Sequence, residues 1–153
     1  MFHIVLYAPQ IPPNTGNIIR LSANTGAQLH LIEPLGFRLD EKSCRRAGLD
    51  YHSLANVQIH RNLDECIEIE GLTRLFVITS HGKESLFDQK FSAGDAFLFG
   101  SETAGLPEQV HARFTAERKL RLPMIEGNRS LNLSNAASIV VYEAWRQVGF
   151  VVI

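Results

Sequence analysis

Short apolar runs alternate with helix-like segments along the 153-residue chain. Apolar residues recur at three- and four-residue spacing from Ala136 to Val148, which predicts a helix with a broad apolar face. Five runs have the composition of strands: Phe2 to Tyr7, Gln28 to Ile32, Arg74 to Thr79, Ala96 to Phe99 and Lys119 to Leu122. This alternation predicts an α/β fold with a mostly parallel sheet that helices cover on both faces.

Glycine and asparagine mark the ends of the other predicted helices. One helix begins near Asn14 and ends before Gly26, and another runs from about Leu63 to Glu70 and stops at Gly71. The segment from Ser80 to Asp95 is rich in Lys, Ser, Gly and Asp and is predicted to be a surface loop. The length allows one hydrophobic core, so we expect a single domain that spans the whole chain.

The charge of the chain limits how it could hold nucleic acid. With a net charge of -1, binding must use a local basic patch or a partner subunit, and the dense basic cluster is Lys42, Arg45 and Arg46. Cys44 and Cys66 do not form a disulfide framework, which favours a reducing compartment. Neither a signal peptide nor a membrane-spanning run is evident, so we expect a cytoplasmic protein that does not bind membranes.

Several common kinds of site do not match the sequence. The chain contains no P-loop, no dinucleotide-binding glycine motif, no zinc-protease motif and no nucleophile elbow. Its histidines lack metal-ligand spacing, so we interpret them as solvated or core residues and expect no metal: His3, His30, His52, His60, His81 and His111.

Three polar turns follow predicted strands, where α/β proteins place their ligands. The first runs from Asn14 to Arg20. Asn14 or Thr15 could satisfy free backbone donors at the helix start, and a cap alone would explain both residues. Arg20 lies about one turn into the helix, and its planar cation suits a phosphate or a developing negative charge. Capping and ligand binding therefore both stay open for this turn.

The other two turns lie in the last third of the chain. In the turn from Gly100 to Pro107, the glycines allow close backbone approach, and Glu102 is a carboxylate that a tight turn does not need. Glu102 could anchor an arginine or accept a hydroxyl proton. In the last turn, Ser134 is expected to cap the helix that follows. More donors and acceptors than one cap requires come from Ser130, Asn132 and Asn135.

In this order, the three turns resemble the motifs of the SPOUT superfamily of S-adenosylmethionine-dependent RNA methyltransferases, in its SpoU, ribose-methylating branch. The resemblance covers nearly the whole chain. It is closest to the family of small bacterial tRNA wobble-nucleotide 2′-O-methyltransferases, through the runs Ile11 to Arg20, Arg45 to His52 and Ser134 to Arg146.

The resemblance implies a C-terminal trefoil knot, although general chain topology argues against knots. It also implies a homodimer packed partly through the last helix, which would bury a face formed by Val140, Val141 and Trp145. The implied cofactor is S-adenosyl-L-methionine, converted to S-adenosyl-L-homocysteine, and the implied partner is tRNA, methylated at a wobble cytidine or uridine of leucine tRNAs.

The resemblance also assigns roles to single residues. The cofactor would be bound by Ile78, Gly100, Leu122, Ser130 and Leu131. The catalytic positions would be Arg20, Glu102 and Asn132. The tRNA would contact Arg45, Arg46, Arg129 and Tyr142.

The implied chemistry is a displacement in which a ribose hydroxyl attacks the methyl group of a sulfonium, so orientation and proton removal are the main tasks of the protein. No metal is required. A guanidinium with a pKa above about 12 is a poor base. We therefore interpret Arg20 as a group that orients the ribose-phosphate and stabilises oxyanion character, with Glu102 holding Arg20.

Two other hypotheses remain. A catalytically silent RNA-binding dimer could keep the same fold, although loss of Arg20 or Asn132 would have favoured it and both are present. A generic nucleotide-binding α/β enzyme would prefer a dinucleotide or phosphate to S-adenosylhomocysteine.

Overall fold

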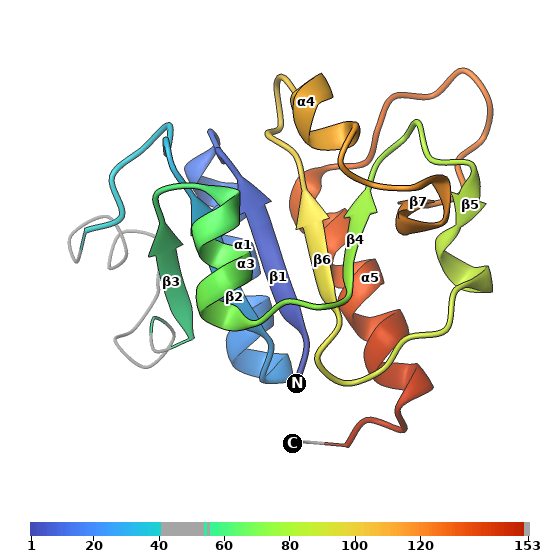
Figure 1. The fold of residues 1–153 in the computed structure, drawn as a ribbon, viewed down its shortest axis with the longest axis horizontal. Helices are drawn as coiled ribbons and strands as arrows, with labels where there is room; N and C mark the ends of the chain where they lie inside the picture. Colours follow the sequence, from blue (N-terminus) through green and yellow to red (C-terminus); the bar gives the residue numbers. More distant parts are fainter. Residues whose placement is uncertain (41–53, 55, 152–153) are drawn as a thin grey trace.

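A parallel β-sheet runs through the middle of the molecule (Figure 1). The computed structural model describes residues 1–40, 54 and 56–151. In this part of the chain seven strands pair in the order β3-β2-β1-β6-β4-β7-β5, and every pairing is parallel. The strands are β1 (His3–Tyr7), β2 (Gln28–Ile32), β3 (Val57–His60), β4 (Leu75–Ile78), β5 (Glu84–Ser85), β6 (Ala96–Phe99) and β7 (Lys119–Arg121).

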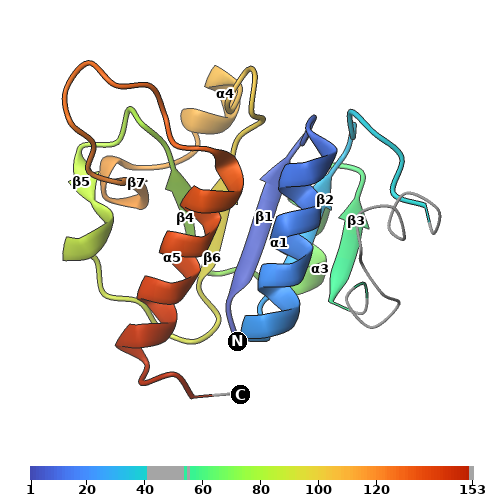
Figure 2. The ribbon, with the colours of Figure 1, turned by 180° about the vertical axis from the view of Figure 1, so that it is seen from behind.

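Helices cover both faces of the sheet, as predicted. Figure 2 shows α1 (Pro12–Thr25) and α5 (Leu133–Gln147) side by side on one face. The opposite face is covered by α3 (Leu63–Glu70) and the short α4 (Glu108–His111), with the 3₁₀ turns η2 (Leu86–Asp88) and η3 (Ala116–Arg118) near β4, β5 and β7. No helix of the described residues combines the length and the apolar character that crossing a membrane requires.

Alternation along the strands supplies two separate cores. In β1, Ile4 and Leu6 are buried toward α1 and α5, whereas Val5 between them is buried toward α3. Because successive side chains of a strand point to opposite faces, a strand that is buried on both faces is apolar throughout, and β6 is the clearest example. The sheet is therefore a rigid platform whose strand ends hold loops in place.

The structure corrects several sequence-based expectations. Two strands, β3 and β5, were not predicted, because β3 has exposed residues at a sheet edge and β5 is only two residues long. The segment from Ser80 to Asp95 is not simply a surface loop, since Leu86 and Phe91 within it are buried in the core. The last helix, predicted from the apolar pattern between Ala136 and Val148, already begins at Leu133.

The apolar face of α5 also differs from the expected one. Val140 and Val141 are fully buried against the sheet of their own chain, so the expectation that a partner subunit buries them was wrong. Instead, Ile139 and Tyr142 are the large apolar side chains of α5 that remain exposed, at 38% and 46%.

Three histidines that are far apart in the sequence lie in a row on the α3 face. His3, His30 and His60 come from the adjacent strands β1, β2 and β3. His3 Nδ1 lies 3.0 Å from His30 Nε2, and His30 Nδ1 lies 3.1 Å from His60 Nε2. Burial, followed by the charges of His3 and His60, lowers the pKa of His30 to about 3, so the ring is neutral at neutral pH. His30 and His60 are core residues, which is one of the two interpretations that the sequence left open.

The lowered pKa of His30 predicts that the protein loses stability in acid. Unfolded His30 binds a proton below its ordinary pKa of 6.5, whereas folded His30 does so only near pH 3. The free energy of unfolding should therefore fall between pH 6.5 and pH 3, by at most about 1.4 kcal/mol per pH unit for this group. Urea unfolding in buffer with EDTA would measure it. His30→Gln should reduce the slope, exposed His81→Gln should not, and equal slopes in all three proteins would contradict the prediction.

Candidate functional site

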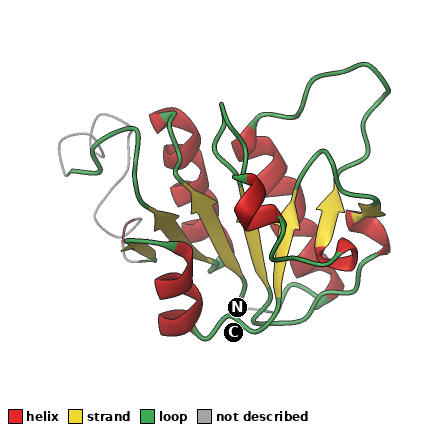
Figure 3. Cartoon of the chain, turned by 45° about the horizontal axis from the view of Figure 1, so that its top comes forward, coloured by secondary structure: helices red, strands yellow, loops and turns green. Residues whose placement is uncertain are grey.

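The candidate site lies where the chain changes direction in the sheet. β1, β2 and β3 follow one another toward one edge, and the later strands lie on the other side of β1, starting with β6. Ligands of open α/β sheets bind at such a switch point, beside the carboxyl ends of the strands. These ends point toward the loops at the top of Figure 1, and Figure 3 shows the same loops from another angle.

A cavity of about 660 Å³ lies at this end of the sheet. Its walls come from the ends of β4, β6 and β7, from the loops that follow them, and from the first turns of α1 and α5. All five residues predicted to bind the cofactor line it: Ile78, Gly100, Leu122, Ser130 and Leu131. Two of the predicted catalytic residues, Glu102 and Asn132, line it as well.

Gly100 shapes one wall of this cavity. The backbone closes on itself here, since the N–H groups of Ser101 and Gly105 each donate to the carbonyl oxygen of the other residue, at 3.1 and 2.8 Å. A Cβ atom on Gly100 would press on the carbonyl carbon of Gly105 and lie 2.5 Å from the backbone nitrogen of Leu106. Only glycine fits this position without moving the loop, as the predicted close backbone approach requires.

A chain of hydrogen bonds joins the three polar turns. The Glu102 carboxylate accepts bonds from the backbone N–H of Gln10 (2.8 Å), the backbone N–H of Ile11 (3.1 Å) and Nδ2 of Asn14 (3.2 Å). Asn132 Nδ2 in turn donates to Asn14 Oδ1 at 2.9 Å. Asn132 Oδ1 accepts from the backbone N–H and from the hydroxyl of Ser134, at 2.9 and 2.7 Å. Asn14 therefore connects two of the three predicted catalytic residues, Glu102 and Asn132.

The role of Asn14 was missed in the sequence. The first helix is capped at Ile11 without any side-chain hydrogen bond, so the capping alternative for Asn14 and Thr15 was wrong. The expected cap at Ser134 was also wrong, because Asn132 caps α5 and Ser134 is already inside the helix. Asparagine and serine are both common N-cap residues, so the sequence does not distinguish Asn132 from Ser134 as the cap of α5. The hydrogen bond from Asn132 to Asn14, across the site, is visible only in the structure.

The remaining predicted residues either do not line the cavity or lie outside the residues that the structure describes. Arg20 is an exposed residue further along α1 and is not among the residues that line the cavity. Its pairing with Glu102 stays a prediction. Arg129 and Tyr142 are exposed, in the loop 122–132 and on α5. Arg45 and Arg46 lie outside the residues that the structure describes.

Three comparisons place the chain among known proteins. The model of the SpoU rRNA Methylase family matches residues 1–142. A tRNA (cytidine(34)-2'-O)-methyltransferase of Burkholderia ambifaria is 57% identical over 152 residues, covering 98% of this chain and 97% of that protein. The Escherichia coli protein of the same name is 53% identical over 150 residues, with 98% and 96% covered.

Solved structures of similar proteins share the fold. A putative RNA methyltransferase from Bacillus anthracis superimposes with a TM-score of 0.90 at 43% identity, covering 98% of this chain and 96% of that one. A structure described as giving insights into the 2-OH methylation of C/U34 on tRNA has a TM-score of 0.87 at 43% identity, covering 97% of each chain. The SpoU methyltransferase AviRb from Streptomyces viridochromogenes, in complex with AdoMet, has a TM-score of 0.80 at 28% identity, with 95% and 60% covered.

Proposed function

The chain belongs to the SpoU rRNA methylase family, and we propose that it is an S-adenosylmethionine-dependent 2′-O-methyltransferase of tRNA that acts on the wobble nucleotide, cytidine or uridine 34. The observation that carries this proposal is the link through Asn14 between Glu102 and Asn132, at a cavity lined by all five expected cofactor residues. Relatives more than half identical over nearly their whole length support the substrate.

The cavity fits the cofactor in size and in chemistry. Its volume of about 660 Å³ is in the range of small-molecule sites. Leu122 and Leu106 contribute buried apolar walls, and Ser130, Glu102 and Asn132 contribute polar groups. S-adenosylmethionine would supply an electrophilic methyl group on a positively charged sulfur, so the protein residues have to position the ribose hydroxyl and handle its proton.

We assign these tasks to three residues. Glu102 fixes the turn before α1 by accepting two backbone N–H groups, which sets the position of the helix that carries Arg20. Arg20 orients the ribose-phosphate and stabilises negative charge on the attacking oxygen. Asn132 is held by Asn14 and Ser134, which leaves little freedom for its side chain beside the cavity. A silent RNA-binding protein would not need this arrangement, so it supports catalysis.

We further propose that the exposed Arg129 and Tyr142, together with Arg45 and Arg46, contact the tRNA. Arg129 belongs to the loop 122–132, which leaves the sheet on the side of the strand ends (Figure 1). An exposed arginine and an exposed aromatic ring suit phosphate binding and base stacking.

A C-terminal knot and a homodimer complete the proposal. From β7, near one edge of the sheet, the chain returns past β4 and β6 to α1, where Asn132 bonds to Asn14, and such a return supports the knot. The exposed Ile139 and Tyr142 on α5 support a dimer interface there.

Deletion of the gene tests the substrate directly. Ribose methylation at nucleotide 34 should disappear from the leucine tRNAs and return when the wild-type gene is supplied. Mapping of ribose methylation in total tRNA would measure this. Unchanged methylation at nucleotide 34 together with a loss elsewhere would overturn the proposed substrate but not the reaction type.

Replacing Gly100 tests the cofactor cavity. Gly100→Ala should weaken binding of S-adenosylhomocysteine at least about tenfold, because the Cβ atom displaces the loop at Leu106. Gly71→Ala is the control for a destabilising glycine replacement elsewhere, since its φ of 63° strains alanine, but no atom lies within 4 Å of the added Cβ and Gly71 lies outside the site. Calorimetric titration in excess EDTA should show saturable binding by the wild type and the control. If chelation abolished binding, our account of the cavity would be wrong.

Replacing Arg20 tests its role in methyl transfer. Arg20→Ala should leave cofactor affinity nearly intact and slow methyl transfer at least about a hundredfold, because a charge-stabilising donor is lost. Arg61→Ala is the control, since Arg61 is an exposed arginine paired with Glu65 and lies outside the cavity. Single-turnover rates with saturating tRNA would measure the effect.

Arg20→Lys separates orientation from base catalysis. Lysine keeps the positive charge but loses the planar two-pronged geometry, so an orienting role predicts a low rate that does not vary with pH. If Arg20 acted as the base, activity of the lysine variant should climb as the pH approaches about 10.4. Wild-type rates in both variants would remove Arg20 from the mechanism.

A charge on α5 tests the dimer. Ile139→Glu should convert a dimer into a monomer, because it buries an unpaired carboxylate in the proposed interface. Ile69→Glu on α3 is the matched control, since Ile69 is also exposed, at 65%. Light scattering at micromolar concentration would measure the mass. A wild-type protein that is a monomer with full activity would contradict the proposed dimer.

A further inference from the structure

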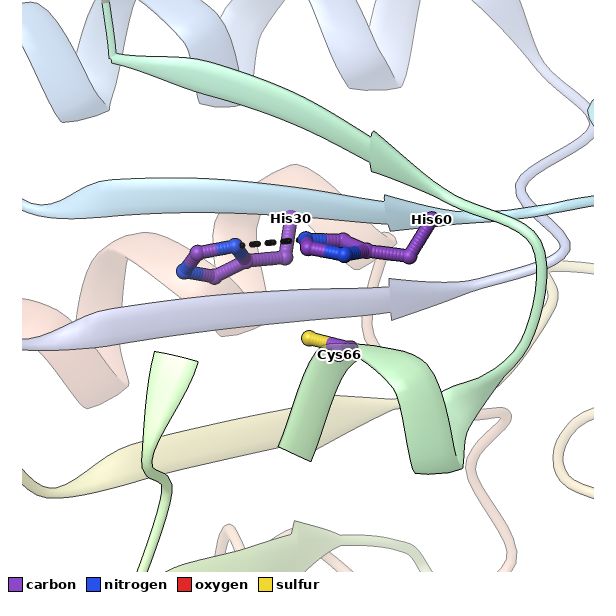
Figure 4. Close-up of side chains that lie close together, drawn as sticks. All are labelled: His30, His60 and Cys66. Carbon is purple, nitrogen blue, oxygen red and sulfur yellow. Dashed lines mark hydrogen bonds between the residues drawn. The ribbon is translucent and has the colours of Figure 1, made fainter. Parts of the chain in front are cut away.

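A second cluster of reactive side chains lies in the core, outside the methyl-transfer cavity. His30 of β2, His60 of β3 and Cys66 of α3 lie close together (Figure 4). Their exposed fractions are 0%, 4% and 0%. Each offers one ligand atom, and these three atoms lie within 4.8 Å of one another. Proposed methyl transfer uses none of them.

The distances suit a metal ion with nitrogen and sulfur ligands. His30 Nδ1 and His60 Nε2 are 3.1 Å apart. Two imidazole nitrogens bound tetrahedrally to Zn²⁺ would be separated by about 3.3 Å, so the spacing of these two nitrogens already fits. The Cys66 sulfur lies within 4.8 Å of both and would move closer when a cation binds. Two imidazoles and a thiolate are donors preferred by Zn²⁺ and Cu⁺.

The neighbours of the cluster complete a second layer. His3 Nδ1 lies 3.0 Å from His30 Nε2, and a Glu70 oxygen lies within 4.8 Å of a nitrogen of both rings. If His30 donates its Nε2–H to His3, its Nδ1 is free to bind a cation, and an outer hydrogen bond of this kind orients many metal-bound histidines. Glu65 and Glu70 also place negative charge near Cys66, where a cation would be attracted, although Glu65 is paired with Arg61.

We propose that His30, His60 and Cys66 form a structural site for one thiophilic d¹⁰ cation, Zn²⁺ or Cu⁺. The cation takes the place of the proton that His30 Nδ1 and His60 Nε2 share. This proton moves to a ring nitrogen that does not bind the cation, and the Cys66 thiol releases its proton to solvent. Burial raises the pKa of the free Cys66 thiol to about 12, so the thiolate forms only when the cation binds. Such a site would join α3 to β2 and β3.

Cobalt is a suitable probe for this site. The full-length protein, reduced and stripped with EDTA, should bind one Co²⁺ per chain and show the near-ultraviolet absorption of a cobalt-thiolate bond. Zn²⁺ should displace the Co²⁺. Cys66→Ser should lose the absorption, whereas Cys44→Ser, which changes the other cysteine of the chain, should keep it. Binding of Cu⁺ alone, lost in Cys66→Ser, would also support the site and would identify its occupant.

Several results would overturn the site. These are a wild-type protein that binds none of the three ions, binding that survives Cys66→Ser, or binding that only Cys44→Ser abolishes. Cys66→Ala serves if Cys66→Ser does not fold, and if neither variant folds, the spectrum of Cys44→Ser decides, because Cys66 is then the one cysteine left in the chain. Binding of S-adenosylhomocysteine in EDTA is measured separately, so failure of the metal site leaves the proposed methyl transfer untouched.

Discussion

The site depends on the amide of Asn14, which bonds to Glu102 on one side and to Asn132 on the other. These three residues come from the start of α1, the loop after β6 and the start of α5. An amide can donate with its nitrogen and accept with its oxygen at the same time, which a carboxylate or a hydroxyl of similar reach cannot do in the same geometry. The side chain of Asn14 is buried, so an unmade bond here would leave polar groups without partners.

The parallel sheet makes this contact possible. β1 and β6 are neighbours with Leu6 opposite Phe99, so the loops that follow them leave the sheet side by side. Glu102 thereby reaches the N–H groups of Gln10 and Ile11 although 91 residues separate Glu102 from Ile11. Because both faces of β6 are buried, its end is held firmly, and the closed turn from Gly100 to Gly105 keeps the cavity wall in place.

The same topology brings a different set of residues together on the opposite face. Each neighbouring strand contributes one histidine to the row of His3, His30 and His60, and α3 places Cys66 against it. The two ligand sets lie on separate parts of the sheet, one beyond the strand ends and one in the core. Methyl transfer beyond the strand ends can therefore be studied independently of metal binding in the core.

Local patterns along the chain were enough to predict the α/β class, five strands, the helix ends at Gly26 and Gly71, and the loops that form the cavity. These features follow from periodicity, glycine and proline, which act over a few residues. Roles such as those of Glu102 and Asn132 came from the resemblance, and the structure brought these residues together without testing their roles. The strands β3 and β5, the link through Asn14, the cap at Asn132, the burial of Val140 and Val141, and the histidine row were decided by the tertiary structure alone. Each depends on which distant segments become neighbours, and strand order and register set that for residues dozens of positions apart.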